Sequence, residues 1–463
     1  MIMDIYTINL TGLLVLCGAL FIAQHRGVPR GGEVEDKKGK DQKNDADLIK
    51  SKSKVKNKKK KKADKWPFLT VYALVMGADW LQGPFLYSLY TDEHALPHAL
   101  VSALFTTGFL SGAVSGTFIG TLADRHGRRA ACHSFCLACA LSCVLTMVPS
   151  LPLLVAGRVL GGLSTSLLFS VFESWMVADV RARGEEVEEE LASMFGAMST
   201  VNSLVAIASG VGSEWLVAVT GTRRAPFAGS VVLLGIAFGG IWMLWAEYYG
   251  EASPSPDNKT SQTPPTSAQS ILTILTDPAV LSLGLISTVF EGSMYLFVFF
   301  WAPALGSVHT SSSSSPLSFG VIFASFMASC LAASLAFNTL PTSKHATLLL
   351  LILFTSAVCF LLSAAPRSEQ AAFWVFCLFE AAVGVYWPCM GCLKGRLIDD
   401  GMRARVYGML RVPLNVFVVV ALLAAGEGPE AYRGVFLVCS GLLFASCGAL
   451  WVVNGRGAAN VAG

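Results

Sequence analysis

Six ionisable side chains lie within long apolar stretches of this chain of 463 residues. An ionisable group inside a bilayer costs at least about 2.5 kcal/mol on insertion scales, so each one requires a partner or a water-filled cavity. A guanidinium offers a fixed fork of donors to an oxyanion, and an acid in apolar surroundings can carry a proton or neutralise a base. The pattern therefore predicts a polar pathway between membrane helices. The six residues are Asp79, Arg158, Glu173, Glu291, Glu380 and Arg411.

Uncharged hydrogen-bonding groups in the same stretches can give neutral contacts to a ligand, and each can equally tie two helices together. They are Gln82, Tyr87, Asn202 and Asn415. Four cysteines from Cys132 to Cys143 follow helical spacing, with His133 beside the first, and would suit copper or zinc. No second helix offers matching ligands, so we expect these cysteines to be core residues and expect neither a metal nor another cofactor.

The composition places these residues in a membrane protein. Hydrophobic residues make up 53% of the chain and charged residues only 14%, whereas a soluble domain carries about 25% charged residues. A water-soluble enzyme is thus excluded, and no nucleophile with a base, metal cluster or phosphate-binding loop stands in a suitable context. A net charge of +3 gives no reason to expect a nucleic-acid partner.

A transmembrane helix needs about 20 mainly apolar residues, and thirteen windows of the chain qualify. The first, residues 5–23, lacks the basic start of a signal peptide and is predicted to be an extra membrane helix. The others are numbered here as spans one to twelve. They begin near Phe68, Ala99, Ala130, Leu151, Ser193, Ala225, Pro278, Leu317, Thr347, Ala371, Arg405 and Tyr432.

Lysines and arginines indicate the orientation, because cytoplasmic loops retain them. Of the 34 such residues, 16 lie between residues 26 and 65, directly after the first window. With that segment inside, the later loops place 12 of them on the cytoplasmic side, including a loop at residues 394–405, and 4 on the other side. We predict an external N-terminus and a cytoplasmic C-terminus. Without a clear signal or retention motif, the plasma membrane is the default location.

Two polar segments divide the chain. Residues 33–65 alternate lysine with Asp, Ser and Asn and should be a disordered tether, with contact to anionic lipid headgroups as the alternative. Residues 251–269 are rich in Ser, Pro and Thr and separate spans six and seven. The expected organisation is an extra helix (1–24), a basic cytoplasmic linker (25–66), a six-helix bundle (67–247), an inter-half linker (248–275), a second six-helix bundle (276–454) and a cytoplasmic tail (455–463).

The loop after span two carries a motif. Residues 120–129 read GTLADRHGRR, which resembles the G-x-L-x-D-r-x-G-r-r signature of the major facilitator superfamily, at the position that this family uses. A degenerate echo at residues 338–345 follows span eight, as two related six-span halves would produce. The resemblance implies an all-α membrane protein with the major facilitator fold, which consists of two six-helix bundles. This chain is expected to have an extra N-terminal transmembrane helix in addition.

The residues of this loop have the chemistry of a latch. Gly120 and Gly127 let helix ends approach closely, and Asp124 can accept hydrogen bonds from the N-terminus of a neighbouring helix. Arg128 can pair with a carboxylate across the half, and Glu173, near the cytoplasmic end of span four, is the acid that we expect it to reach. Such contacts would hold one conformation and break in the other. A plain positively charged loop is the alternative interpretation.

The same resemblance predicts where the charged residues lie in the fold. Major facilitator proteins are built from four three-helix repeats whose first helices, spans one, four, seven and ten, line the cavity, and five of the six charges fall on these spans. Arg158 begins an R-x-x-x-G pattern found in many proton-linked members, and it is either a cavity residue or part of a structural ion pair. Arg411, in a span disrupted by a proline, is expected to contact the ligand. Asp79 and Glu291 are either partners of the two arginines or proton carriers, and Glu380 is a further candidate for either role.

Several stretches resemble one branch of the superfamily, the molybdate-anion transporters. The most specific are GADWLQGPFLY at residues 77–87 and GRVLGGLSTSLLFSVFESW at residues 157–175. Shorter ones are FEG at residues 290–292, WAP at residues 301–303 and RVPLN at residues 411–415. This resemblance covers most of the twelve-span region in order.

Membership of this branch would imply transport of molybdate, a tetrahedral dianion, by two halves that rock around a site at the bilayer midplane. One or two guanidiniums with neutral donors suit such an anion, and a proton on Asp79 or Glu291 can balance the charge. The expected ligands are Arg158, Arg411, Gln82 and Tyr87, with Asn202 and Asn415 as further neutral groups. A carrier of sulfate, a sugar or an organic anion is the alternative, and so is a membrane receptor that does not move its ligand. A monomer is the default oligomeric state.

Overall fold

A computed structural model of the chain describes residues 5–27, 65–183, 187–249, 278–309, 316–337, 345–365, 368–397, 413–425 and 431–462. Within these ranges, eleven helices are long and apolar enough to cross a membrane. With α3 and a shorter apolar helix at Pro413–Ala424, they occupy all thirteen predicted windows. The helices are α1 (Ile5–Gly27), α3 (Trp66–Gln82), α5 (His98–Gly116), α7 (Arg128–Thr146), α8 (Leu151–Arg183), α9 (Val187–Thr220), α10 (Ala225–Leu244), α12 (Pro278–Gly306), α13 (Phe319–Phe337), α14 (His345–Ser363), α15 (Glu369–Leu397), Pro413–Ala424 and α17 (Ala431–Ala462).

Span one does not remain an α-helix along its whole length. After α3, the chain continues through a 3-10 turn, η1 (Gly83–Phe85), a short α4 (Leu86–Ser88) and a π-helical turn, η2 (Leu89–Glu93). The change begins at Pro84, because proline has no amide hydrogen and its ring clashes with the carbonyl four residues before it. Gln82 and Tyr87 therefore lie on either side of a local irregularity.

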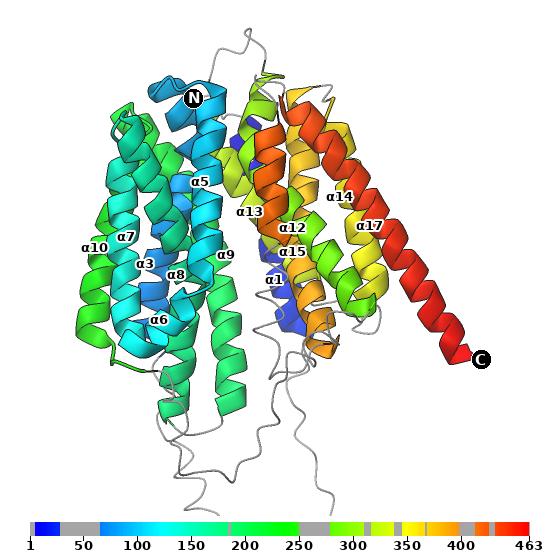
Figure 1. Cartoon of the computed structure of the whole chain (residues 1–463), viewed down its shortest axis with the longest axis horizontal. Coiled ribbons are helices and arrows are strands. Elements are labelled where there is room, and N and C mark those ends of the chain that lie inside the picture. Colours follow the sequence, from blue (N-terminus) through cyan, green and yellow to red (C-terminus); the bar gives the residue numbers. More distant parts are fainter. Residues whose placement is uncertain are drawn as a thin grey trace, which may run out of the picture.

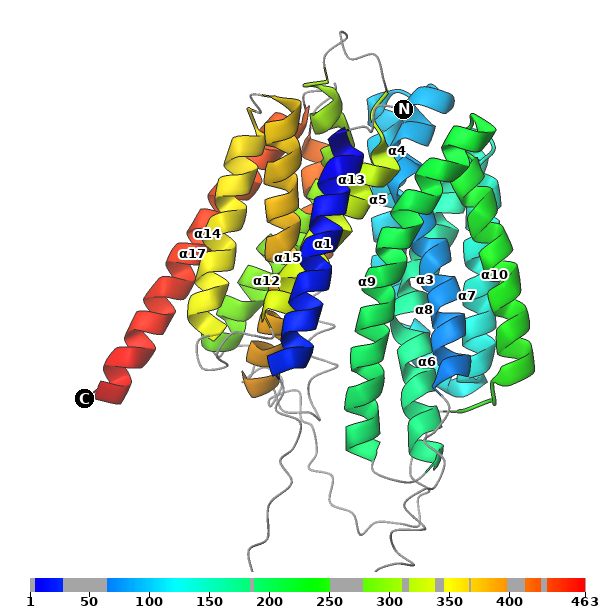
Figure 2. The same cartoon turned by 180° about the vertical axis from the view of Figure 1, so that it is seen from behind.

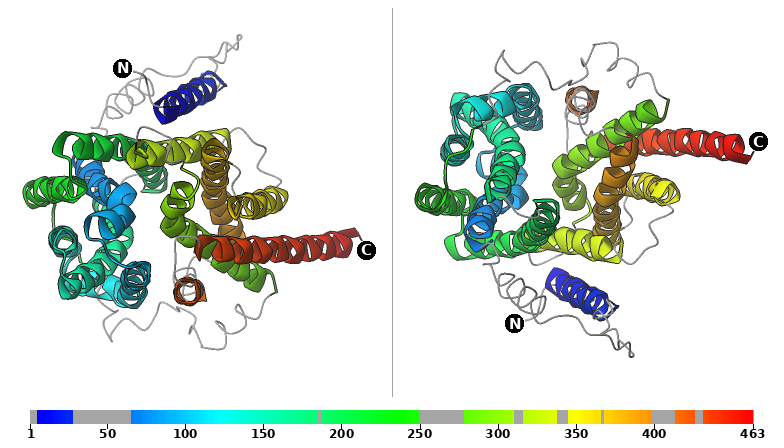
Figure 3. Two further views of the ribbon diagram at one scale, coloured as in Figure 1. Left: turned by 90° about the horizontal axis from the view of Figure 1, so that it is seen from above. Right: turned by 90° about the horizontal axis from the view of Figure 1, so that it is seen from below.

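The membrane helices form two bundles that lie side by side (Figure 1; Figure 3). Helices α3 to α10 make the N-terminal bundle, and helices α12 to α17 make the C-terminal bundle. Stacked rings fill one end of the N-terminal core, where Trp175 and Trp245 have centroids 3.9 Å apart and Phe68 packs 5.5 Å from Trp245. Phenylalanines fill the C-terminal core, as at Phe297 and Phe379, whose centroids are 4.9 Å apart. Burial of these apolar faces against each other defines the bundles.

Contacts between the two bundles gather toward one end of the helices. The amide nitrogen of Gly320 in α13 donates to Oε2 of Glu214 in α9 at 2.8 Å, and Gly320 packs on Gly210 of the same helix. Phe105 of α5 and Phe299 of α12 meet edge to face at 4.7 Å. This end lies opposite the short helix α6 (Ile119–His126), which belongs to the signature loop (Figure 1). Following the predicted orientation, it is called the outer end below.

The first helix, α1, packs along the C-terminal bundle, chiefly against α13 (Figure 2). Its buried residues recur at helical spacing on one face, from Tyr6 and Leu10 to Leu13 and Cys17. Hydrogen bonds support this face along its length: Asn9 Nδ2 donates to Gln370 Oε1 at 3.1 Å, and Gln24 Nε2 donates to the carbonyl of Leu335 at 2.6 Å. The thiol of Cys17 donates to the carbonyl of Ala328 at 3.3 Å. α1 is thus a specifically packed thirteenth helix.

Candidate functional site

Arg158 lies on α8 and its guanidinium rests against α5. Its Cζ is 5.2 Å from the ring centroid of Phe105, a cation–π distance. Its Nε is buried without a hydrogen-bond partner, as is the hydroxyl of Tyr90 close by. Among the described residues, no carboxylate forms an ion pair with this guanidinium. The expected pairing with an acid is therefore not seen in this part of the chain, and a buried donor remains unsatisfied.

Glycines let α5 and α8 cross closely at this point. A Cβ on Gly162 would lie 2.3 Å from the carbonyl oxygen of Gly108 and 2.6 Å from the amide nitrogen of Gly112. Only glycine fits such a crossing, which is common where membrane helices pack. Beside it, the hydroxyl of Ser111 donates to the carbonyl of Val159 at 2.6 Å. The crossing fixes the backbone next to Arg158 against α5.

A second charged cluster joins α12 to α15 in the C-terminal bundle. Lys394 Nζ lies 3.5 Å from Glu291 Oε1 and donates to the hydroxyl of Ser287 at 2.9 Å. The hydroxyl of Tyr386 donates to the same Glu291 oxygen at 2.9 Å, and Ser287 donates to it as well. Lys394 was expected at the start of a loop, whereas α15 continues as a helix to Leu397. Glu291 is therefore paired with a lysine of its own bundle.

Asp79 and Glu380 have a different environment. Asp79 of α3 is half-buried, and the Glu380 side chain of α15 is buried. No basic side chain in the described ranges forms an ion pair with either acid. Their surroundings thus differ from that of Glu291, and both remain candidates for carrying a proton.

Two of the predicted neutral ligands contact neighbouring helices. Trp80 Nε1 donates to Asn202 Oδ1 at 2.8 Å, which ties α3 to α9. Gln82 Nε2 donates to the carbonyl of Ala78 at 3.0 Å and lies 3.7 Å from the sulfur of Cys139 in α7. Asn202 therefore acts as an interhelical tie, and Gln82 points toward α7.

Tyr87 lies where the two bundles meet. Its hydroxyl is 3.0 Å from Nδ1 of His98, and its ring packs edge to face on Phe299 of α12 at 5.6 Å. On span eleven, Asn415 is half-buried, while Arg411 lies outside the described residues. The predicted ligands of the N-terminal bundle are thus placed by the structure, whereas the arginine predicted for the C-terminal bundle is not.

The loop at residues 120–129, called the signature loop, makes contacts other than those expected. Arg128 donates to Asp124 Oδ1 through both Nε, at 3.0 Å, and Nη2, at 2.9 Å, so the acid binds an arginine instead of a neighbouring helix N-terminus. Arg128 Nη1 donates to the carbonyl of Ser174 at 3.0 Å, while the adjacent Glu173 is exposed. The expectation that Arg128 reaches the Glu173 carboxylate was wrong. Among the described residues, no neighbouring atom lies within 4 Å of a Cβ built on Gly120, so no close approach within this part of the chain explains that glycine.

Glu247, just after α10, is the acid that sequence reasoning missed. Its carboxylate accepts hydrogen bonds from the amide nitrogens of Arg129, at 2.7 Å, and Ala130, at 3.2 Å, in the first turn of α7. Free amides and the helix dipole favour an anion at this position. Gly127 precedes this turn with φ of +104°. The sequence signal was an acid three residues beyond Leu244, where the apolar helix α10 ends.

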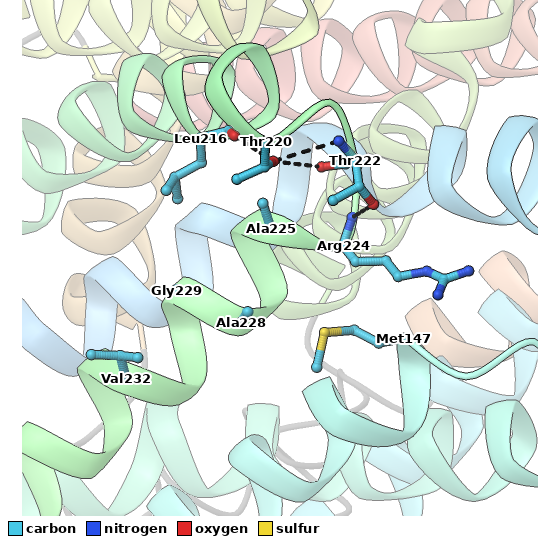
Figure 4. A pocket seen from close by; sticks show the side chains of 9 residues that line it. All are labelled: Met147, Leu216, Thr220, Thr222, Arg224, Ala225, Ala228, Gly229 and Val232. Atoms are coloured by element: carbon cyan, nitrogen blue, oxygen red, sulfur yellow. Dashed lines mark hydrogen bonds between the residues drawn. The ribbon is translucent and has the colours of Figure 1, made fainter.

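A pocket of about 420 Å³ opens near the outer end of the N-terminal bundle (Figure 4). Its walls are mainly apolar, and Arg224 at its edge already pairs with Glu93, with Arg224 Nε 2.8 Å from Glu93 Oε1. It includes none of the predicted site residues. It is lined by Met147, Leu216, Thr220, Thr222, Arg224, Ala225, Ala228, Gly229 and Val232.

Comparison with known proteins identifies relatives over most of the chain. A family described as sugar transporters with 12 transmembrane segments matches residues 46–371. The chain is 32% identical over 392 residues to the molybdate-anion transporter of Xenopus tropicalis, covering 81% of this chain and 82% of that protein. It is 30% identical over 418 residues to the molybdate-anion transporter of Takifugu rubripes, covering 82% of this chain and 85% of that protein.

Solved structures share the fold at low sequence identity. A peptide transporter, POT, in complex with sulfate aligns with a TM-score of 0.68 at 13% identity, over 84% of this chain and 94% of that one. The nucleoside transporter NupG aligns with a TM-score of 0.62 at 12% identity, over 84% of this chain and 98% of that one. At such identities the likeness concerns the arrangement of helices alone.

Proposed function

The chain is a membrane transporter of the major facilitator superfamily, in its molybdate-anion transporter branch, and we propose that it moves molybdate across the membrane. The observation that carries this proposal is the guanidinium of Arg158, which has a buried Nε without a partner. A guanidinium without a carboxylate partner, as here among the described residues, is costly inside a bilayer unless an anion occupies the site during function. Arg also matches the geometry of a tetrahedral oxyanion better than a point charge does.

Alternating access is the proposed mechanism. The contacts between bundles at the outer end, Gly210 with Gly320 and Phe105 with Phe299, support a conformation closed on that side. Arg158 packs directly on Phe105, so the anion site would lie beneath this contact. Rocking of one bundle against the other would break the outer contact and bring the site to the opposite face.

Proton coupling is the second part of the proposal. Glu291 already has Lys394 as a counter-charge, whereas Asp79 and Glu380 have no basic partner among the described residues. The latter two acids are therefore the preferred carriers. A proton that travels with the dianion would reduce the charge moved through the apolar bilayer.

We place the protein in the plasma membrane, with its N-terminus outside and its C-terminus in the cytoplasm. The start of α1 and the end of α17 lie at opposite ends of the bundles (Figure 1). The charge bias of the loops supports this orientation.

Uptake of labelled molybdate by cells lacking their own carrier tests the proposal. Arg158→Ala should lower the initial rate by about tenfold or more, since the lost contact is charge-assisted. Arg183→Ala, at the far end of the same helix, should stay within about twofold, because its partner is a cytoplasmic acid, Asp179.

Four outcomes would overturn or change parts of the proposal. Absence of molybdate uptake by wild type would reject the cargo, and binding without uptake would favour a receptor. Equal competition by sulfate would widen the cargo to tetrahedral dianions in general. A rate that does not respond to an imposed pH gradient would reject the coupling proton.

A further inference from the structure

We propose that Lys394 is a ligand in the C-terminal bundle for the transported oxyanion, and that Glu291 is the internal anion from which Lys394 moves when the oxyanion binds. This inference rests on the proposed transport of molybdate. It assigns a role to a residue that lies at the end of an apolar stretch, where its sequence position suggested a loop.

The geometry shows that Lys394 and Glu291 can separate while the Glu291 carboxylate keeps other hydrogen-bond donors. Lys394 Nζ is 3.5 Å from Glu291 Oε1, longer than an ordinary charge-assisted hydrogen bond, and closer to the neutral hydroxyl of Ser287, at 2.9 Å. Glu291 also accepts hydrogen bonds from Tyr386 and Ser287. When Lys394 moves away, the carboxylate therefore retains two hydroxyl donors. A compact ammonium on a flexible four-carbon stem suits such a movement.

The position in the fold suits a ligand role. The cluster joins α12 and α15, and α12 lies on the side of its bundle that faces the N-terminal bundle (Figure 3). The side chains of Lys394 and Glu291 are 14% and 12% exposed, respectively, so the pair is not fully buried in the core. Pro388 interrupts α15 before Lys394, where a missing amide loosens the helix and permits bending.

Charge gives the third argument. A dianion needs more than the single positive charge of Arg158, and that charge belongs to the N-terminal bundle. A cation contributed by each bundle would draw the two halves together around the anion, which a site on one bundle alone does not do. Glu291 would then replace the anion as the partner of Lys394 after release, so the empty carrier need not expose an unpaired lysine.

The test is a set of variants in the purified full-length protein, with molybdate binding measured by calorimetry and uptake measured in proteoliposomes. Lys394→Gln should raise the dissociation constant for molybdate by about tenfold or more. Glu291→Gln should lower it by several fold, because the internal competitor is removed, while slowing turnover through delayed release. Lys65→Gln, a cytoplasmic lysine that donates to Ser193, is the control and should leave both quantities unchanged.

The double variant Lys394→Gln/Glu291→Gln separates a ligand from a structural ion pair. It removes both charges with little change of volume, so its melting temperature should stay near that of wild type. If Lys394 binds the anion, affinity should remain weak in this variant. Recovery of wild-type affinity would show that the pair only holds α12 to α15 and would overturn the inference. Failure of wild type itself to bind molybdate would instead reject the proposed function.

Discussion

Gly127 introduces α7 with a backbone that glycine adopts more readily than other residues, at φ of +104°. A Cβ there would lie 2.6 Å from Cδ of Glu247, the acid that holds the first turn of α7. Gly127→Ala should therefore lower the free energy of unfolding by about 1–3 kcal/mol through strain and loss of this contact. The melting temperature of the purified transporter would measure it.

Gly120→Ala in the same loop is the matched control. A Cβ at this position would meet no neighbouring atom within 4 Å, and alanine favours a helix over glycine, so no loss is expected. Equal losses in the two variants would show that the loop tolerates neither change for a general reason. An unchanged melting temperature in Gly127→Ala would refute the close contact between Gly127 and the carboxylate of Glu247.

The sequence predicted which charged residues lie within apolar stretches, but it did not predict which residues they contact. Arg158 and Glu291 stand out because a charge within an apolar stretch is rare whatever the tertiary structure. Lys394 and Glu247 do not stand out, since each lies at the edge of an apolar stretch, where a charge is ordinary. The contacts between these side chains depend on how each helix is rotated about its axis and on how far it extends beyond its apolar residues. The hydrophobic pattern determines neither the rotation nor the extension.

At the scale of elements, the existence of the helices was predictable and their ends were not. Within the described residues, each predicted window contains a helix, because a backbone in lipid must satisfy its own hydrogen bonds. The helices α8 and α9, however, have 33 and 34 residues, about 50 Å at 1.5 Å per residue. Their extensions, at the C-terminal end of α8 and the N-terminal end of α9, are polar, so the apolar pattern that predicted the spans could not reveal them.

The packing of α1 on α13 gives a prediction at this scale. Leu10 is buried against the C-terminal bundle, whereas Leu16 of the same helix is 48% exposed. Leu10→Ala should destabilise the protein by about 1–2 kcal/mol, less than in a water-soluble core because lipid can occupy the face that is uncovered. Thermal unfolding in nanodiscs would measure the loss. Leu16→Ala should cost little, and equal effects would contradict specific packing of α1.

At the scale of the whole molecule, the proposed alternating access requires one sequence to specify two arrangements of the same bundles. The apolar pattern predicts the helices, and the charge bias predicts their direction across the membrane. Both patterns are the same in either arrangement of the bundles. The sequence therefore could not show at which end the bundles touch. The structure answers this for one arrangement through backbone contacts: a Cβ on Gly210 would lie 2.7 Å from the carbonyl oxygen of Gly320 and 2.9 Å from the amide nitrogen of Ala324.

Gly210→Val should consequently prevent closure of the outer end, because the backbone of α13 cannot yield as a flexible side chain can. We expect the maximal rate of molybdate uptake to fall about tenfold or more, while molybdate still binds from outside to right-side-out vesicles. Gly212→Val on the same helix is the control, since its nearest neighbour is a leucine methyl at 3.8 Å, and its uptake should stay within about twofold. Normal uptake by Gly210→Val would mean that the outer contact is not part of the transport cycle. Loss of binding as well as uptake would mean that the substitution damages the site itself instead of the rocking of the bundles around it.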